Sequence, residues 1–185
     1  MSAFTVRRVI TGHNVAGRAV FVTDEQVEAE HRFIDLAQGE KTLDSADIWT
    51  AGTVPALNTG PAVNSGPADA GDAGNPAGTA PERTVVLRIS ELPPGSVSPM
   101  HRTQTLDYGI LLAGTCSLML DSGEVKHLQA GDVVIQRGTS HSWVNRGKVP
   151  CRWAWILISA EPVQVGGNDL PAEWRAAPEQ PVVIP

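Results

Sequence analysis

Five polar side chains, divided between two glycine-bounded segments, are the residues of this chain best suited to chemistry. They are His101, Thr103 and Asp107 in residues 95–114, and Gln136 and His141 in residues 131–145. Side chains of a strand alternate between its two faces, so the three odd-numbered residues of the first segment share a face if no bulge intervenes. Two imidazoles and one carboxylate, joined by the fold, form a ligand set that a divalent metal with open coordination positions accepts. The sequence therefore predicts His101, Asp107 and His141 as metal ligands.

The elements that must position these residues are short strands. Apolar, strand-like runs occur at 84–90, 108–113, 115–121, 124–129, 132–136, 142–145 and 152–160, most of them separated by glycine-containing turns. Short strands at this spacing are typical of an antiparallel all-β barrel or sandwich. No strand–helix–strand alternation is visible, which argues against a parallel sheet. We expect residues 83–160 to form a β-barrel.

The flanking regions have different compositions. Residues 1–50 contain strand-like runs at 4–10 and 18–23 and a helix-compatible stretch at 24–29. The apolar pair Ile48 and Trp49 is a possible anchor. We therefore expect an N-terminal strand extension that packs on the barrel. Residues 51–82 are rich in Ala, Gly and Pro and predict a flexible loop, because they cannot bury enough apolar surface to offset chain entropy. Residues 161–185 predict an extended C-terminal tail over the surface, with Trp174 as a possible anchor.

Composition excludes several classes of partner. The chain has 185 residues, 42% of them hydrophobic, which supports one domain with an ordinary core. A net charge of −6 argues against nucleic acid or an anionic membrane as partner. We find no apolar run of membrane-spanning length and no secretion signal, and expect a cytoplasmic protein. The two cysteines, Cys116 and Cys151, lie in apolar runs and are expected to be buried thiols.

The two glycine-bounded segments resemble the signature motifs of the cupin superfamily. Matching positions are Gly95, His101, Gly114, Gly131, Gly138, His141 and Asn145. The stretches 101–109 and 136–145 are similar to a subgroup of small stand-alone cupins. The resemblance implies a small antiparallel β-barrel of the jelly-roll class, and because cupins have many activities it implies no single reaction.

Three departures from the cupin pattern affect the proposed site. Thr103 stands where a second His is usual, Asp107 where Glu is usual, and Gln136 where Pro is usual, and the second motif is one residue shorter. With Thr103 a poor ligand, His101, Asp107 and His141 remain as the ligands that the resemblance implies for Zn, Fe or Mn. Asp is shorter than Glu, so Asp107 either holds the metal closer to its strand or fails to reach it. In the second case Asp107 becomes a buried carboxylate suited to proton transfer.

Two classes of function follow. The first is a metal-dependent enzyme that acts by lyase or cyclase chemistry on a small organic substrate with an aromatic ring or a carboxylate. In this enzyme Asp107 moves a proton, and Thr103 or Gln136 orients water or substrate. A non-haem Fe(II) oxygenase is the alternative reaction. The second class is a non-catalytic module that binds a small molecule. Residues 4–23 carry enough strand-forming sequence to pair with a second copy, as the resemblance also implies, so a homodimer is expected.

Other residues have structural explanations. Tyr108 should face away from the three odd-numbered residues, and Asn145 should hold a turn. Trp143, Trp153 and Trp155 should form core or pocket wall. Arg88 and Arg102 are expected at solvated surface positions, and His13, His31 and His127 receive no role.

Overall fold

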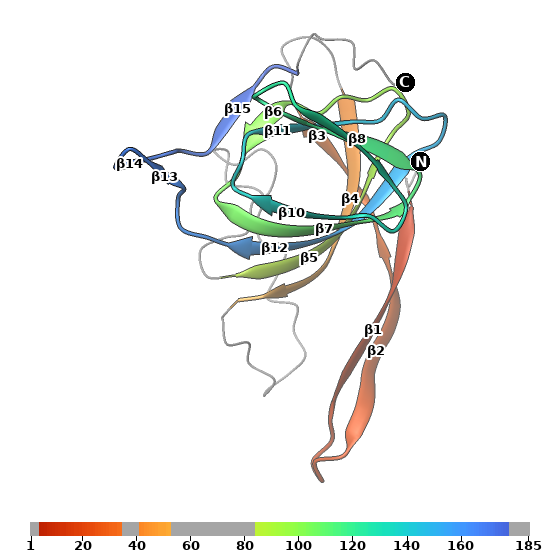
Figure 1. The fold of residues 1–185 in the computed structure, drawn as a ribbon. Helices are drawn as coiled ribbons and strands as arrows, with labels where there is room; N and C mark the ends of the chain where they lie inside the picture. Colours follow the sequence, from red (N-terminus) through yellow and green to blue (C-terminus); the bar gives the residue numbers. More distant parts are fainter. Residues whose placement is uncertain (1–3, 35–40, 53–83, 178–185) are drawn as a thin grey trace.

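The protein is all-β. A computed structural model describes residues 4–34, 41–52 and 84–177, and none of these residues is helical. The strands form two large antiparallel sheets and two separate two-stranded hairpins, β1–β2 and β13–β14 (Figure 1). The predicted antiparallel jelly-roll barrel is therefore confirmed. In the described part of the chain, no helix has the length and apolar character that a membrane span requires.

The larger sheet has six strands, in the order β10-β7-β12-β5-β4-β3. Their bounds are β3 Glu30–Ile34, β4 Lys41–Ala51, β5 Val85–Leu92, β7 Thr105–Ala113, β10 Val133–Arg137 and β12 Cys151–Ser159. The second sheet has five strands, in the order β15-β6-β11-β8-β9. Their bounds are β6 Met100–Arg102, β8 Thr115–Leu120, β9 Val125–Gln129, β11 His141–Val144 and β15 Glu173–Arg175. The expected strands of residues 83–160 thus all form.

Alternation of side chains builds the interior between the sheets. Residues of β5 are buried and half-buried in strict turn, as expected for a strand with one face inside. The inner faces of β11 and β12 supply a cluster of Trp143, Trp153 and Trp155, with ring centroids 4.7 to 5.2 Å apart. On β7, Gly109 lies directly under the Trp155 ring, and a Cβ at that position would overlap the indole. Glycine is required there by the close approach of an aromatic side chain.

The N-terminal extension is a long hairpin. Strand β1, Thr5–His13, pairs with β2, Ala19–Glu28, with one bulge between Ile10 and Thr11. The helix-compatible stretch 24–29 is therefore strand rather than helix, because it pairs along its length with β1. Near the barrel, Phe4 and Ala29 pack with Ala46 and Ile48 of β4. Ile48 belongs to β4, a strand of the six-stranded sheet itself, and forms part of this buried cluster. The rest of the hairpin extends away from the barrel (Figure 1).

The C-terminal region contributes a strand to the five-stranded sheet in addition to the predicted extended chain. After the small hairpin of β13, Gln164–Val165, and β14, Asn168–Asp169, the chain adds β15 to the five-stranded sheet beside β6. The loop predicted at 51–82 lies almost entirely outside the described residues. Cys116 and Cys151 are buried free thiols, as predicted.

Candidate functional site

Two histidines from different segments meet at one register position. His101 of β6 and His141 of β11 are directly paired across the sheet, and their ring centroids are 4.2 Å apart. Each ring is held by the backbone two residues before it. Nδ1 of His101 lies 2.9 Å from the Pro99 carbonyl, and Nδ1 of His141 lies 2.9 Å from the Thr139 carbonyl. The prediction that the fold joins these two imidazoles is confirmed.

These contacts determine the state of both rings. A carbonyl oxygen only accepts, so each Nδ1 carries a hydrogen, and Nε2 is the nitrogen left for a ligand. Burial lowers the pKa of His101. Burial and the neighbouring His101 lower the pKa of His141 to about 3. At neutral pH both rings are therefore uncharged, and their Nε2 atoms are hydrogen-bond acceptors or metal ligands.

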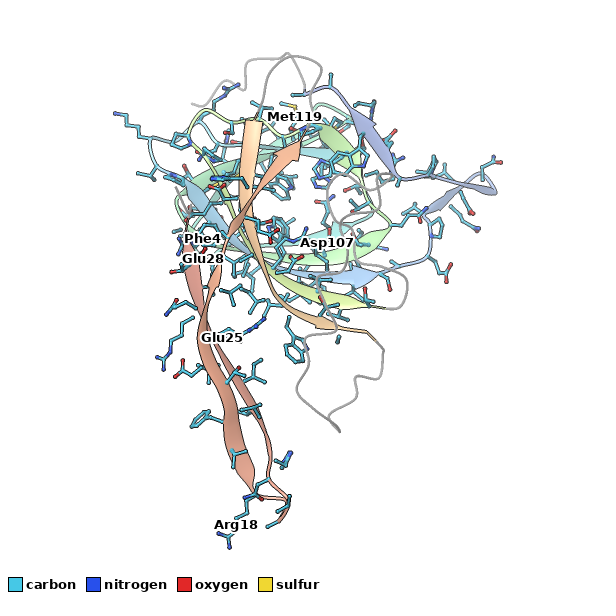
Figure 2. All side chains as sticks on the ribbon, turned by 180° about the vertical axis from the view of Figure 1, so that it is seen from behind. Phe4, Arg18, Glu25, Glu28, Asp107 and Met119 are labelled. Carbon is cyan, nitrogen blue, oxygen red and sulfur yellow. The ribbon has the colours of Figure 1, made fainter. Side chains whose placement is uncertain are left out.

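Asp107 supplies a buried carboxyl group to the same cavity. It lies on the inner face of β7, is 6% exposed, and sits within the barrel (Figure 2). Burial raises its pKa to about 6, although a hydrogen bond with the Thr105 side chain and the charge of Arg88 both oppose this rise. Its Oδ1 atom is buried without a hydrogen-bond partner. An unsatisfied buried acceptor costs stability, and such groups concentrate where a ligand or reaction uses them.

An ion pair that the sequence did not predict lies behind Asp107. Arg88 is buried rather than solvated, because β5 turns it inward, where its Nε donates to Asp47 Oδ1 at 2.5 Å and its Nη2 to Asp47 Oδ2 at 3.1 Å. Arg102 is also largely covered and pairs with Glu173 at 3.2 Å. The expectation of surface positions for both arginines is thus wrong. The Arg88 side chain lines the cavity and places a positive charge near the site.

Four tryptophans contribute to the cavity wall. The cavity has a volume of about 120 Å³, and its lining includes Trp143, Trp153, Trp155 and Trp174 together with the site residues above. Trp174 lies opposite His101 in the β15–β6 register, and its ring stacks on that imidazole with centroids 4.5 Å apart and 8° between planes. The sequence indicated Trp174 only as a possible anchor; no local motif reveals that β15 reaches β6.

Of the remaining residues that the sequence analysis considered, some line the cavity and others hold turns around it. Thr103 lines the cavity, with its hydroxyl 2.7 Å from that of Thr105. Gln136 is buried but is not part of the cavity lining, and its amide donates to Thr139 in the turn before His141. Tyr108 faces outward, and Asn145 holds its turn by donating to the carbonyls of Leu92 and Val149, as expected.

The predicted metal ligands can be tested against this geometry. Both imidazoles have the arrangement that metal-bound histidines require, with Nδ1 donating to a carbonyl and Nε2 left for the metal. Asp107 lines the same cavity, but within the described residues no group of three His, Cys, Asp or Glu side chains lies close enough together to hold an ion. Two ligands fit, and the set of three remains a prediction.

Comparison with known proteins gives the family. Residues 88–157 match the model of the cupin domain. The chain is 34% identical over 168 residues to the cupin-domain-containing oxidoreductase fogC of Aspergillus ruber, a match that covers 89% of this chain and 78% of that protein. The chain belongs to the cupin superfamily. This cupin is also 33% identical to the cupin-domain-containing oxidoreductase virC of Hypocrea virens, over 89% of the chain and 81% of the relative.

Among solved structures, this cupin is similar to the polyketide cyclase RemF from Streptomyces resistomycificus. The TM-score is 0.46 at 17% sequence identity, and the match covers 83% of this chain and 82% of that chain. His101 and His141, which lie in the two cupin-like segments of the sequence, pair across the sheet and both line the cavity, and Trp174 stacks on His101.

Proposed function

We propose that this cupin is an enzyme that transfers protons on a flat, ring-containing small molecule, by lyase or cyclase chemistry. The observation that carries the proposal is the carboxyl group of Asp107, buried in an aromatic-walled cavity with one oxygen unpaired. A carboxyl with a pKa near 6 is mostly ionised at neutral pH and still basic enough to accept a proton from a substrate.

The cavity wall supports a flat and largely apolar substrate. Aromatic side chains favour stacked or edge-on contact with rings. Trp174 stacks on His101 and Trp143 lies edge-on to His141, so these four rings form one continuous aromatic side of the cavity against which a flat ring would lie.

The polar groups support hydroxyl and carbonyl substituents on that ring. Nε2 of His101 and Nε2 of His141 only accept hydrogen bonds in their neutral form, so they suit substrate hydroxyl groups. The positive charge of Arg88 in the lining would stabilise negative charge on a substrate carbonyl as it becomes an enolate.

A dehydration can be written with these groups alone. The Asp107 carboxylate removes a proton from the carbon next to the carbonyl, and the electron pair of that C–H bond becomes the enolate. The enolate then re-forms the carbonyl, makes a C=C bond and expels a β-hydroxyl, which takes the proton from Asp107 and leaves as water. The carboxylate is regenerated, and no oxidant is consumed.

The experiment tests the first step without the natural substrate. Chelator-treated protein is incubated in D₂O with 2-tetralone, a ketone fused to a benzene ring and bearing an acidic C–H next to its carbonyl, and deuterium incorporation is followed by NMR. We expect exchange above the buffer rate with the wild type and loss of the excess with Asp107→Asn. A wild-type rate equal to buffer, with ring binding retained, would contradict metal-free proton transfer by Asp107 and would leave a metal-dependent enzyme or a binding module.

A metal-dependent oxidoreductase is the second candidate. Two observations favour it: both imidazoles present Nε2 with Nδ1 held by a carbonyl, and the relatives matched over most of their length are named oxidoreductases. His101 and His141 would hold Fe, Zn or Mn, and Asp107 lines the same cavity as a further carboxylate. Metal analysis separates the candidates: an equimolar metal that is lost in a His101→Ala, His141→Ala variant supports this one.

A further inference from the structure

A second cavity lies beside β8 and β9, and it shares no lining residue with the cavity of Asp107. Its volume is about 350 Å³. Cys116 and Leu128 pack in the barrel core, and the side chains of a strand alternate between its two faces. Ser117 and His127, their neighbours along the two strands, therefore lie on the opposite face of the sheet. The polar side of this cavity thus faces away from the site described above.

Ser117 and His127 form a hydrogen-bonded pair in the second cavity. They are directly opposite each other in the β8–β9 register, and Oγ of Ser117 lies 2.8 Å from Nδ1 of His127. If the hydroxyl donates, the neutral ring carries its hydrogen on Nε2; if the ring donates, the hydroxyl hydrogen is free. In both arrangements the pair keeps one polar hydrogen that a ligand oxygen can accept.

Arg146 supplies a positive charge to the same cavity. It follows the end of β11, and within residues 4–34, 41–52 and 84–177 no carboxylate forms an ion pair with it. Thr115 lies at the same end of the cavity, because a Cβ on Gly147, the residue after Arg146, would be 3.2 Å from Thr115 Oγ1. A guanidinium beside a hydroxyl suits a carboxylate, which accepts charge-assisted hydrogen bonds from both.

The distance between these two polar points sets the length of a ligand. Thr115 and Ser117 are two residues apart on β8, so they share a face and lie about 6 to 7 Å apart. The surface beside them is apolar, since Val144 pairs with Ser117 and lines the cavity together with Leu128. A short carbon chain with a polar group at each end matches this arrangement.

A carboxylate in the cavity limits the charge that a ligand carries. Asp132 lines the cavity from the turn between β9 and β10, where its Oδ2 accepts the backbone N–H of Gln129 at 2.9 Å. Like charges in one cavity repel each other, and the single charge of Arg146 does not balance two further carboxylates. A ligand with one carboxylate and a neutral second acceptor therefore fits better than a dicarboxylate or a phosphate.

We propose that this second cavity binds a short aliphatic carboxylate that carries a ketone at about the fifth carbon. The carboxylate lies against Arg146 and Thr115, and the ketone oxygen accepts a hydrogen bond from the Ser117–His127 pair. The carbon chain between them lies on Val144. This site is separate from the cavity of Asp107, so binding here does not depend on the chemistry proposed there.

The test uses 5-oxohexanoate as the probe. Two comparison compounds each lack one of its polar groups: hexanoate has no ketone, and 2-hexanone has no carboxylate. Isothermal titration calorimetry measures each dissociation constant for wild type, Arg146→Ala and a Ser117→Ala, His127→Phe double variant. Arg137→Ala is the matched control, because Arg137 is an exposed arginine of β10 that lines neither cavity. Circular dichroism and thermal unfolding check that each variant folds.

The expected pattern separates the two ends of the site. Arg146→Ala should raise the dissociation constants of both carboxylates by about 10-fold or more, because hydrogen bonds to charged groups are the stronger ones. The double variant should raise that of 5-oxohexanoate by about 5-fold and leave that of hexanoate unchanged. Arg137→Ala should change neither, and 2-hexanone should bind more weakly than 5-oxohexanoate.

NMR of the histidine rings locates the ligand. The chain has five histidines, and 5-oxohexanoate should shift the ring resonances of His127 and leave those of His101 and His141 unchanged. Shifts at His101 and His141 instead would place the ligand in the cavity of Asp107 and overturn the proposal. No saturable binding, or equal losses in the Arg146 and Arg137 variants, would overturn it as well.

Discussion

Replacing Asp107 by Asn should make the protein more stable at neutral and alkaline pH. Burial raises the pKa of Asp107 from 3.8 to about 6, which means that the folded protein prefers the neutral carboxyl. At about 1.4 kcal/mol for each pH unit, holding the ionised group in the cavity costs about 3 kcal/mol once the pH exceeds 6. An uncharged amide of similar size removes that cost, and the unpaired Oδ1 atom has no hydrogen bond to lose.

The sign of the pH dependence follows from proton binding. Between about pH 4 and 6 the folded protein binds more protons at Asp107 than the unfolded chain does, so this group lowers stability as the pH rises through that window. The difference between Asp107→Asn and wild type should therefore be small near pH 4 and reach about 3 kcal/mol in favour of the variant near pH 8.

Urea unfolding of chelator-treated proteins across this pH range measures the difference, and chelation keeps any bound ion from adding its own stabilisation. Leu43→Val, at an apolar residue that lines the same cavity and does not titrate, is the control whose effect should not change with pH. A variant that is destabilised equally at every pH would show that the carboxylate is well solvated or paired, and the reasoning about Asp107 would be wrong.

Three further predictions concern the walls of the cavity. Trp174→Ala should weaken binding of a planar probe such as 2-naphthol by about 2- to 10-fold, and Trp174→Phe should largely restore it, as fluorescence titration can measure; equal loss in both variants would argue against stacking. The pKa of His141 is lowered to about 3, so the stability that its neutral ring contributes is present above pH 6.5 and is lost as the pH falls. His141→Gln should therefore reduce the fall in the free energy of urea unfolding between about pH 6.5 and 4 by roughly 3 kcal/mol. An unchanged fall would contradict burial of His141 in its neutral form. Gly109→Ala should lower stability by about 1 to 3 kcal/mol, because the new Cβ overlaps the Trp155 ring; a neutral effect in thermal unfolding would mean that the ring moves freely.

The barrel could be predicted from the sequence because its strands are short, alternating and separated by glycines. The meeting of His101 and His141 could also be predicted, since both lie in family motifs and the fold pairs β6 with β11. These features depend on local pattern and on a recurrent topology, and both are visible in one chain.

Residues distant in sequence could not be placed in the same way. Arg88 stands between Leu87 and Ile89 in β5, a pattern that favours an outward-facing charge. Nothing local shows that Asp47 of β4 lies across the β4–β5 pair and forms an ion pair with it. Trp174 reaches the cavity through three residues of strand in a proline-rich region, a signal too short to read. The stretch 24–29 has helix-compatible residues, and only its pairing with β1 makes it a strand.

The pH profile of deuterium exchange into 2-tetralone is the measurement that tests the proposed chemistry most directly. If Asp107 removes the proton, the excess rate of chelator-treated wild type should rise with pH to a plateau with a midpoint near 6, and Asp107→Asn should abolish it. Exchange that survives Asp107→Asn, or that appears only when a metal is added back, would contradict catalysis by this carboxyl group.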